Sequence, residues 1–411
     1  MFSVKAADPV PGTLAAGRMR VAIVCDLIEE NWPSMELIAD MLLEHLDSSA
    51  APLRPPMRPH FRRLPFLSRQ AKSYNADRLV NRFVDYPRWL KRQVSDFDLF
   101  HIVDHSYAQL VHYLPPERTV VTCHDLDTFR CLLDPDRERR PGWFRAMTGR
   151  ILSGLKKAAH VIAVSAATRD EILRHRLLPP DRVSVIPNGV HPSCLPIPDA
   201  LADAELEKLL PAVGNNAIWL LNVGSTMPRK RMDVLLRVFA SVRREIADVR
   251  LLRAGGPLTR EQLQLARELG VENAMVVLPS LSRPVLAAAY RRADLLLHTA
   301  DAEGFGLPLI EAMACGCPAL VSDLPVLREV GGTAAAYAPV AGIEAWKGAV
   351  LRMLRERAGS PGAWNLRRQH AIARASLFSW GEAARQTAAI YKSVLRSREA
   401  ASLWSMTKQR L

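Results

Sequence analysis

Two glutamates, Glu303 and Glu311, lie eight positions apart around a glycine-rich turn. The turn follows a predicted buried strand over Ala293 to His298 and opens a helix that we expect to end near Ala314. Free amides at a helix start can hold an anion, and glycines let the backbone approach a bulky ligand. The turn therefore suits a phosphate or diphosphate. Glu303 would face this ligand, and Glu311, near the same helix face, would accept hydrogen bonds from hydroxyls such as those of a ribose.

The order of residues around this turn is more specific than the two acids, because most glutamates are solvated surface residues. The string Glu-Gly-Phe-Gly-Leu-Pro, followed by Glu311 and then Ala-Met-Ala-Cys-Gly-x-Pro, resembles the signature of family 4 glycosyltransferases of the GT-B fold. The resemblance implies that Glu303 contacts the donor sugar and Glu311 the nucleotide ribose. We expect the remainder of the turn to bind the donor with them: Gly304, Phe305, Gly306 and Leu307.

Three consecutive cations, at positions 229–231, enter a predicted helix directly after a strand. Cleavage of a sugar–phosphate bond leaves negative charge on a nucleoside diphosphate, and cations aimed at that charge stabilise the transition state more than the ground state. A solvated helix face is the alternative interpretation. The string Gly-Ser-Thr-Met-Pro-Arg-Lys resembles the family's Gly-Thr-Leu-x-Pro-Arg-Lys variant, which makes Lys230 our first choice for the diphosphate and Arg229 our second. Gly224 and Ser225 join the donor site, although many relatives carry an arginine where this chain has Ser225.

A histidine and an aspartate, His124 and Asp125, end the strand predicted over 119–123 and so point toward the expected cleft. A histidine in such a short motif is more often structural. At this strand end, however, it resembles the family's histidine that approaches the donor sugar, so we predict that His124 contacts the sugar. Asp125 carries less weight, and we assign it to the acceptor. The strand before it ends in His101, Asp104 and His105, which could line the acceptor pocket.

The loop after the first strand, residues 26–35, departs from the family, whose members commonly carry a Gly-Gly there. Its polar residues could bind an acceptor sugar while Trp32 stacks on it, and a plain surface loop is an equal alternative. Two further donor contacts are predicted in the second half of the chain. Gly255 belongs to a tight turn after a strand, and Leu281 occupies the place where the family lines the nucleobase.

Histidines and aspartates gather at the two strand ends described above, so metal ligation there is conceivable from residue type. The family resemblance instead implies metal-independent chemistry. We therefore expect no metal site and no cofactor, with the nucleotide-sugar as a substrate.

The chain carries a formal net charge of +13, which calls for an acidic partner. The excess is concentrated in residues 51–92, where eleven basic residues face only Asp77 and Asp85 and aromatic residues are interleaved. A solvated surface, an anionic lipid or lipid-phosphate surface, and nucleic acid are the alternatives. We favour the anionic membrane and expect no nucleic-acid partner, because no nucleic-acid-binding module is recognisable.

Short apolar strands alternate with amphipathic helices in two series along the 411 residues, which is the pattern of α/β proteins with parallel sheets. The predicted architecture is GT-B, with two Rossmann-like doubly wound parallel-sheet domains facing a cleft. We place the N-terminal acceptor domain at 1–195 and the C-terminal donor domain at 196–379, with a final helix over 380–411 packing back on the first domain. A Pro-rich segment ending near Pro198 marks the linker.

We find no convincing membrane span and no secretory pattern, and six scattered cysteines argue against a disulfide scaffold. These features predict buried thiols and a cytoplasmic protein, with a peripheral place at the inner face of a membrane as an open alternative.

The predicted function is transfer of a sugar from a nucleotide-diphosphate sugar to a glycan or lipid-linked acceptor, with retention of configuration inferred from the family alone. Cell-surface polysaccharide or glycolipid synthesis is the expected setting. Two alternatives stay open: another GT-B enzyme, such as a phosphorylase or a nucleotide-sugar epimerase, and a catalytically silent donor-binding subunit. Residue types do not identify the sugar, the base or the acceptor.

Overall fold

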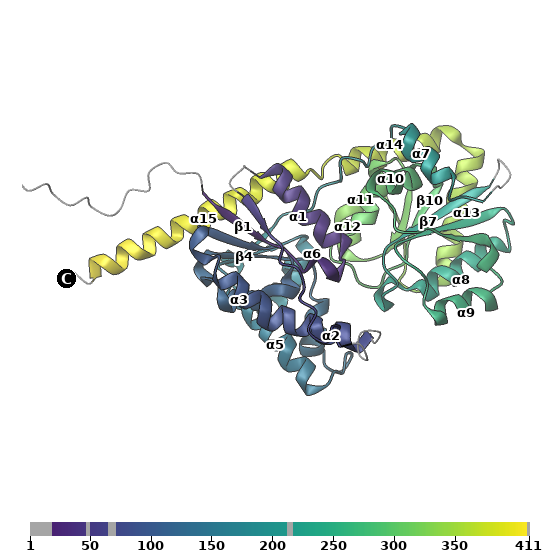
Figure 1. The fold of residues 1–411 in the computed structure, drawn as a ribbon. Helices are drawn as coiled ribbons and strands as arrows, with labels where there is room; N and C mark the ends of the chain where they lie inside the picture. The colour runs from purple at the N-terminus through teal and green to yellow at the C-terminus, as the bar shows by residue number, and fades with distance from the viewer. Residues whose placement is uncertain (1–18, 47–49, 65–70, 212–216, 409–411) are drawn as a thin grey trace, which may run out of the picture.

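A computed structural model describes residues 19–46, 50–64, 71–211 and 217–408 of the chain. The chain forms two lobes, each built around a six-stranded parallel sheet with helices on its faces (Figure 1). The expected α/β fold of GT-B type, with two doubly wound sheets, is confirmed.

The first sheet has the strand order β2-β1-β3-β4-β5-β6, and every neighbouring pair is parallel. Its strands are β1 (Val21–Val24), β2 (Ala50–Leu53), β3 (Leu99–Ile102), β4 (Thr119–Cys123), β5 (His160–Ala163) and β6 (Val183–Val185). The chain order reverses between β1 and β3, which is the place where open parallel sheets bind ligands. The helices of this lobe are α1 (Pro33–His45), α2 (Ala71–Val80), α3 (Tyr86–Lys91), α4 (Arg130–Leu133), α5 (Gly142–Lys157) and α6 (Ala166–Arg174), with a π-helical turn over Asn81–Asp85 and a 3-10 helix over His105–Tyr113.

The second sheet has the order β12-β11-β10-β7-β8-β9 and reverses between β7 and β10. Its strands are β7 (Ile218–Val223), β8 (Val249–Ala254), β9 (Met275–Val277), β10 (Leu295–His298), β11 (Ala319–Ser322) and β12 (Ala336–Ala338). The remaining helices are α7 (Ala200–Glu207), α8 (Met232–Arg243), α9 (Arg260–Glu268), α10 (Arg283–Arg292), α11 (Leu307–Ala314), α12 (Pro325–Gly331), α13 (Ile343–Gly359), α14 (Pro361–Ala375) and α15 (Trp380–Lys408).

Most predicted strands and helices end within a few residues of their observed bounds, and the missed elements are short. The edge strand β2 has the sequence Ala-Ala-Pro-Leu, which lacks the β-branched residues typical of strands, and its proline is tolerated because the strand lies at the sheet edge. All six cysteines are free and buried, as expected. Within the described residues, we find no helix that combines the length and the apolar character needed to cross a bilayer.

Helix α15 leaves the second lobe and lies against α1 and the first sheet (Figure 1). Two passages of the chain touch where it crosses between the lobes: the Val190 amide donates to the Phe378 carbonyl at 3.1 Å. A Cβ on Gly189 would lie 2.3 Å from the Trp380 nitrogen, so the crossing passages pack without space for a side chain.

His101 anchors α15 rather than lining an acceptor pocket, which corrects that prediction. Its Nδ1 lies 2.6 Å from the Tyr391 hydroxyl and its Nε2 lies 2.7 Å from the Thr122 hydroxyl. Burial, with a smaller contribution from His124, lowers the pKa of His101 to about 3, so this histidine is neutral. The prediction failed because successive side chains of a strand point to opposite faces of the sheet, and His101 is the penultimate residue of β3.

The lobes meet at Gly304, the first glycine of the turn before α11. The Gly304 carbonyl accepts a hydrogen bond from the Ser165 hydroxyl at 2.9 Å, and a Cβ on Gly304 would lie 2.0 Å from the His124 carbonyl oxygen. On α12, the Glu329 carboxylate accepts from the Ala166 and Ala167 amides at 2.7 and 3.1 Å, at the positive start of α6. These contacts hold the carboxyl edges of the two sheets together.

We expect Gly304→Ala to lower the melting temperature and to enlarge the radius of gyration, because the added methyl group overlaps the His124 carbonyl. Overpacking of this kind costs about 1–3 kcal/mol. Calorimetry and small-angle scattering measure both quantities. Gly362→Ala is the matched control, since nothing lies within 4 Å of a Cβ there. Equal behaviour of the two variants would contradict the close contact of the lobes.

Candidate active site

A lysine and a glutamate form an ion pair across the point where the second sheet reverses its strand order. Lys230 ends the loop after β7, Glu303 lies in the loop after β10, and the Lys230 ammonium bonds the Glu303 carboxylate. Both side chains are about nine-tenths buried, at 12% and 11% exposure. The two residues that the sequence singled out from separate motifs are therefore in direct contact.

His298, at the end of β10, completes this pair. Its Nε2–H donates to the same Glu303 oxygen at 2.9 Å. Burial lowers the pKa of His298, so the ring is a neutral donor. Burial alone would raise the pKa of Glu303, but Lys230, His298 and Arg229 together hold it well below its ordinary value. No motif singles out His298 in the sequence, because it lies in a run of apolar strand residues.

Arg229 joins the two lobes at the same place. Its guanidinium donates to the Ala302 carbonyl at 3.1 Å and forms an ion pair with Asp127 of the first lobe at 3.0 Å. Asp125, predicted as an acceptor residue, lies 3.8 Å from the same guanidinium. Thus both cations predicted to bind a diphosphate are held by carboxylates.

Glu311 is buried within α11, and its two oxygens have separate partners. The Tyr290 hydroxyl donates to one at 2.9 Å, and Arg283 donates to the other at 3.4 Å. Burial raises the pKa of Glu311, against the opposing effects of Arg283 and Tyr290. Arg283 also donates to the Pro33 carbonyl of the first lobe at 3.0 Å. Neither partner was predicted, since both come from α10, distant in sequence from the glutamate motif.

Glycines line the loops between these side chains, and four of them adopt a positive φ: Gly224 at 144°, Gly255 at 115°, Gly256 at 99° and Gly306 at 98°. A Cβ on Gly255 would lie 2.0 Å from the Gly224 carbonyl oxygen, so the loops after β7 and β8 touch through their backbones. Ser225 follows Gly224 in this loop and is half-buried. The close approach requires glycine at position 255, and the φ of 144° favours glycine at position 224.

Arg253, the penultimate residue of β8, is fully buried beneath these loops. One guanidinium nitrogen donates to the Gly224 carbonyl at 2.5 Å and another to the Ala254 carbonyl, while the buried Nε has no hydrogen-bond partner among the described residues. Burial lowers the pKa of Arg253 to about 10. A positive charge therefore lies under the loop that carries Ser225 in place of the family's arginine.

Phe305, Leu307 and Leu281, three predicted donor contacts, pack against apolar side chains. The Phe305 ring is buried against Phe378, at 5.8 Å between ring centroids. Leu307 is half-buried and packs against the cores of both lobes. Leu281 is half-buried beside α10.

His124 is 8% exposed, and its Nε2–H donates to the Val103 carbonyl at 2.7 Å. Its backbone amide donates to His105 Nδ1 at 3.3 Å. Burial lowers the pKa of His124, although Asp104 acts in the opposite direction. The ring is therefore neutral. Because Nε2 is bonded to the Val103 carbonyl, the other ring nitrogen, Nδ1, points away from Val103.

The predicted acceptor residues Asp104, His105 and Asp125 form one cluster beside His124. Asp104 accepts from the Ser106 amide at 2.8 Å and from the Ser106 hydroxyl at 2.6 Å. His105 Nε2 lies 3.3 Å from the Thr128 hydroxyl and 3.7 Å from Asp125. The structure therefore brings the ends of β3 and β4 together, as parallel strands require.

Trp32 has a fixed orientation although its ring is 37% exposed. The indole N–H donates to the buried Glu30 carboxylate at 3.1 Å, and Arg78 donates to Glu30 at 2.8 Å. Arg82 lies 3.7 Å from the same carboxylate, with its guanidinium 4.0 Å from the Tyr107 ring centroid. The loop that carries Trp32 is therefore held by arginines of the basic segment.

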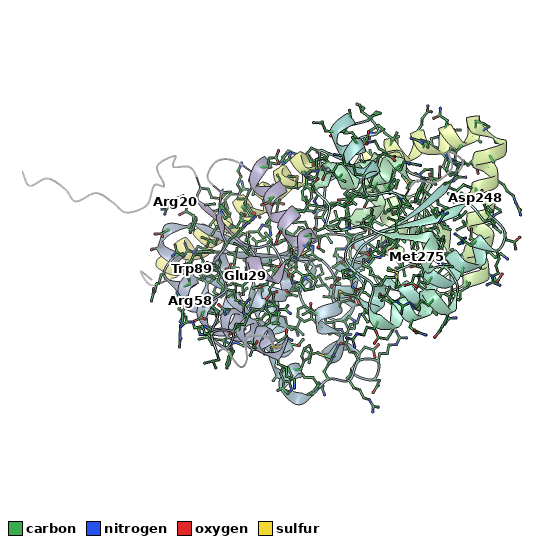
Figure 2. All side chains as sticks on the ribbon, turned by 45° about the vertical axis from the view of Figure 1, so that its right-hand side comes forward. Arg20, Glu29, Arg58, Trp89, Asp248 and Met275 are labelled. Carbon is green, nitrogen blue, oxygen red and sulfur yellow. The ribbon has the colours of Figure 1, made fainter. Side chains whose placement is uncertain are left out.

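This pairing changes the interpretation of residues 51–92. Besides Arg78 and Arg82, the segment pairs Arg54 with Asp40 and Arg62 with Asp77. The backbone amide of Met57 donates to the two carboxylate oxygens of Glu29 at 3.0 and 2.9 Å. Figure 2 labels Glu29 and Arg58 in the first lobe. Arg69 and Phe66 lie outside the described residues. Much of the local basic excess thus neutralises acids of the same lobe.

Within the described ranges, no group of three or more His, Cys, Asp or Glu side chains is arranged to hold a metal ion.

We expect Glu303→Gln to lower the free energy of unfolding by about 3–5 kcal/mol at neutral pH, because it leaves the buried Lys230 charge unpaired. The folded-state pKa of Glu303 lies below its ordinary value of 4.5, so the wild-type advantage is complete above pH 4.5 and is lost as the pH falls through the folded-state pKa. Denaturant titrations from neutral to acid pH measure the difference. Glu205→Gln, at an exposed position of α7, is the control. If the difference in unfolding free energy between the wild type and Glu303→Gln does not vary with pH, the ion pair is excluded as its source.

Comparisons with known proteins agree with this geometry. Residues 44–193 match the family described as Glycosyltransferase Family 4, and residues 211–370 match the family described as Glycosyl transferases group 1. The chain is 28% identical over 342 residues to O-antigen chain mannosyltransferase B of Escherichia coli, covering 81% of this chain and 83% of the relative. It is 37% identical over 169 residues to D-inositol 3-phosphate glycosyltransferase of Mycobacterium marinum, covering 38% of this chain but only 34% of that protein.

Solved structures share the fold. Sucrose-phosphate synthase from Thermosynechococcus elongatus superposes with a TM-score of 0.71 at 19% identity, covering 92% of this chain and 100% of the other. HepE from Anabaena in complex with UDP and glucose gives 0.69 at 17% identity, with 92% and 100% coverage. The chain belongs to glycosyltransferase family 4, has the GT-B fold and is a glycosyltransferase.

Proposed function

We propose that the protein transfers a sugar from a nucleotide-diphosphate sugar to a hydroxyl of a glycan or lipid-linked acceptor, with retention of configuration. The observation that carries the proposal is the Lys230–Glu303 pair at the strand reversal between β7 and β10. Cations, glycine backbone groups and the N-terminus of a helix converge there, and these are the groups that bind a diphosphate. The similar solved structure of HepE contains UDP and glucose, which supports a nucleotide-sugar donor for this protein.

In this mechanism the diphosphate lies against Lys230, Arg229 and the first amides of α11, and the ribose hydroxyls bond Glu311. The bond between the sugar C1 and the phosphate oxygen breaks, and the two cations stabilise the charge that develops on the leaving diphosphate. The acceptor oxygen attacks C1 from the face that the diphosphate leaves. Its proton passes to the departing phosphate oxygen, so the reaction needs neither a separate side-chain base nor a metal ion.

The carboxylates that now hold the cations have a role in this mechanism. Asp127 and Asp125 keep Arg229 at the seam between the lobes, and Glu303 keeps Lys230 beside Gly224. An incoming diphosphate exchanges for these carboxylates, which frees Glu303 to accept a hydroxyl of the donor sugar. His124 approaches the same sugar from the first lobe. The similarity to an O-antigen chain mannosyltransferase supports a role in cell-surface polysaccharide or glycolipid synthesis.

The proposal predicts that one of UDP, GDP or ADP, or a sugar conjugate of it, binds and raises the melting temperature, equally with and without magnesium. Lys230→Ala should reduce the turnover number by about 10²–10³, the usual cost of losing one such donor. Lys208→Ala, at an exposed position, is the control. NMR of the first product reports whether the anomeric configuration is retained. If no nucleotide binds at low millimolar concentration, the proposed donor reaction is refuted.

A second proposal is that the enzyme works at the inner, anionic face of a membrane, through basic residues of the first lobe that remain exposed. Support comes from exposed cations beside exposed apolar side chains in residues 58–92, namely Arg58, Phe61, Arg63, Leu64, Lys72, Leu79, Arg88 and Arg92. This combination suits a headgroup surface.

The double variant Arg88→Glu/Arg92→Glu should weaken binding to phosphatidylglycerol vesicles by more than tenfold, since each basic residue contributes about 1 kcal/mol. Cosedimentation at low and high salt measures it, and salt should release the wild type. Arg237→Glu, on the other lobe, is the control. Equal binding to neutral phosphatidylcholine vesicles would contradict the proposal.

A further inference from the structure

Arg253 is a cation in the interior of the second lobe, directly beneath the loop that follows β7. Its side chain is fully buried, and none of the described aspartates and glutamates forms an ion pair with it. Burial lowers its pKa to about 10, so the guanidinium is still charged at neutral pH. Burying a charge is costly unless a group of opposite charge pairs with it. The retention of a cation at this position therefore points to a function outside folding.

The guanidinium donates to backbone carbonyls, and one of these belongs to the loop after β7. The Gly224 carbonyl accepts at 2.5 Å, and the Ala254 carbonyl accepts from another nitrogen. A second side chain binds the same loop, because Gln262 of α9 donates to the Thr226 carbonyl at 3.3 Å. Two carbonyls of this loop, at positions 224 and 226, are thus fixed by side chains of β8 and α9.

The peptide group that joins Gly224 to Ser225 presents its amide on the side opposite to Arg253. The described residues contain no cis peptide bond, and in a trans peptide the carbonyl and the N–H point in opposite directions. Ser225 is half-buried, and among the described residues neither its amide nor its hydroxyl has a hydrogen-bond partner. An amide donor is therefore available to a ligand.

This amide lies on the stretch of loop that the Lys230 side chain crosses. A Cβ on Gly224 would lie 3.8 Å from Lys230 Cε, so the lysine stem passes beside the same residue. A cation bound to a carbonyl polarises the whole peptide group and makes its N–H a stronger donor. Preorganised backbone amides stabilise anions, especially where water is excluded. The charge of Arg253 can therefore act at the loop surface although the guanidinium is not exposed.

We infer that Arg253 is a positioning residue of the donor site, which fixes and polarises the peptide between Gly224 and Ser225 so that the Ser225 amide donates to the diphosphate. The inference rests on the proposed function and adds a third positive group to Lys230 and Arg229. Arg253 does not touch the ligand, because it acts through one peptide group. Its contribution is confined to ligands that carry phosphate, and binding of the nucleoside part does not depend on it.

Calorimetry and saturation-transfer NMR with uridine, guanosine, adenosine and their diphosphates test the inference. For the base that the wild type binds, Arg253→Met should weaken diphosphate binding by about tenfold or more, because charge-assisted hydrogen bonding is lost, and should leave nucleoside binding unchanged. The donor KM should rise while the acceptor KM stays constant. Arg250→Met, the same change at the other end of β8, is the control. Arg250 is half-buried and donates to the Asn273 carbonyl at 3.2 Å.

Arg253→Lys keeps a cation but replaces the guanidinium fork by an ammonium, so it should bind the diphosphate more weakly than the wild type and the nucleoside equally well. This variant tests the inference even if Arg253→Met does not fold. Equal weakening of nucleoside and diphosphate, or diphosphate binding at the wild-type level, would overturn the inference, because Arg253 would then be structural. Those results leave the proposed donor reaction intact. A wild type that binds no diphosphate refutes that reaction, and the inference with it.

Discussion

The reversal of strand order in each sheet is the constraint on which the rest of the molecule depends. At β1/β3 and at β7/β10 the connecting helices leave toward opposite faces, so the loops there separate and side chains can meet between them. Every strand is parallel to its neighbours, which puts all the polar loop residues at one edge of each sheet. Gly304 brings the two edges together, because only a residue without a side chain fits against the His124 carbonyl.

The sequence identified the residues at strand ends better than it identified their partners. Glu303, Lys230 and His124 follow strands that can be recognised in the sequence as apolar runs. The order of residues in their motifs also resembles that of the family. Their partners His298, Tyr290 and Arg283 lie within ordinary strand and helix patterns, and only the folded arrangement of β10 and α10 brings them to the motif residues. The parallel arrangement of both sheets was predictable. Short edge strands such as β2 were not, because pairing with the neighbouring strand stabilises them more than the intrinsic strand propensity of their residues does.

Composition was the least reliable guide. The basic excess of residues 51–92 suggested one exposed surface, yet Arg78 and Arg82 pair with Glu30, Arg62 with Asp77, and Arg54 with Asp40. Net charge over a window counts residues that are neighbours in sequence, whereas ion pairs join residues that are neighbours in space. Glu30 lies outside the window, and its buried carboxylate needs both arginines. Arg253 illustrates the converse, because a strand pattern gives no sign that one of its members is a fully buried arginine whose pKa burial lowers.

The two chain passages between the lobes, near Gly189 and near Trp380, have a mechanical consequence. They touch through the Val190–Phe378 hydrogen bond and leave no space for a side chain between them. Two adjacent chain passages that pack this closely form a hinge element, at which the lobes can rotate relative to one another more readily than they can slide. A rotation there would displace residues far from the two passages more than residues beside them.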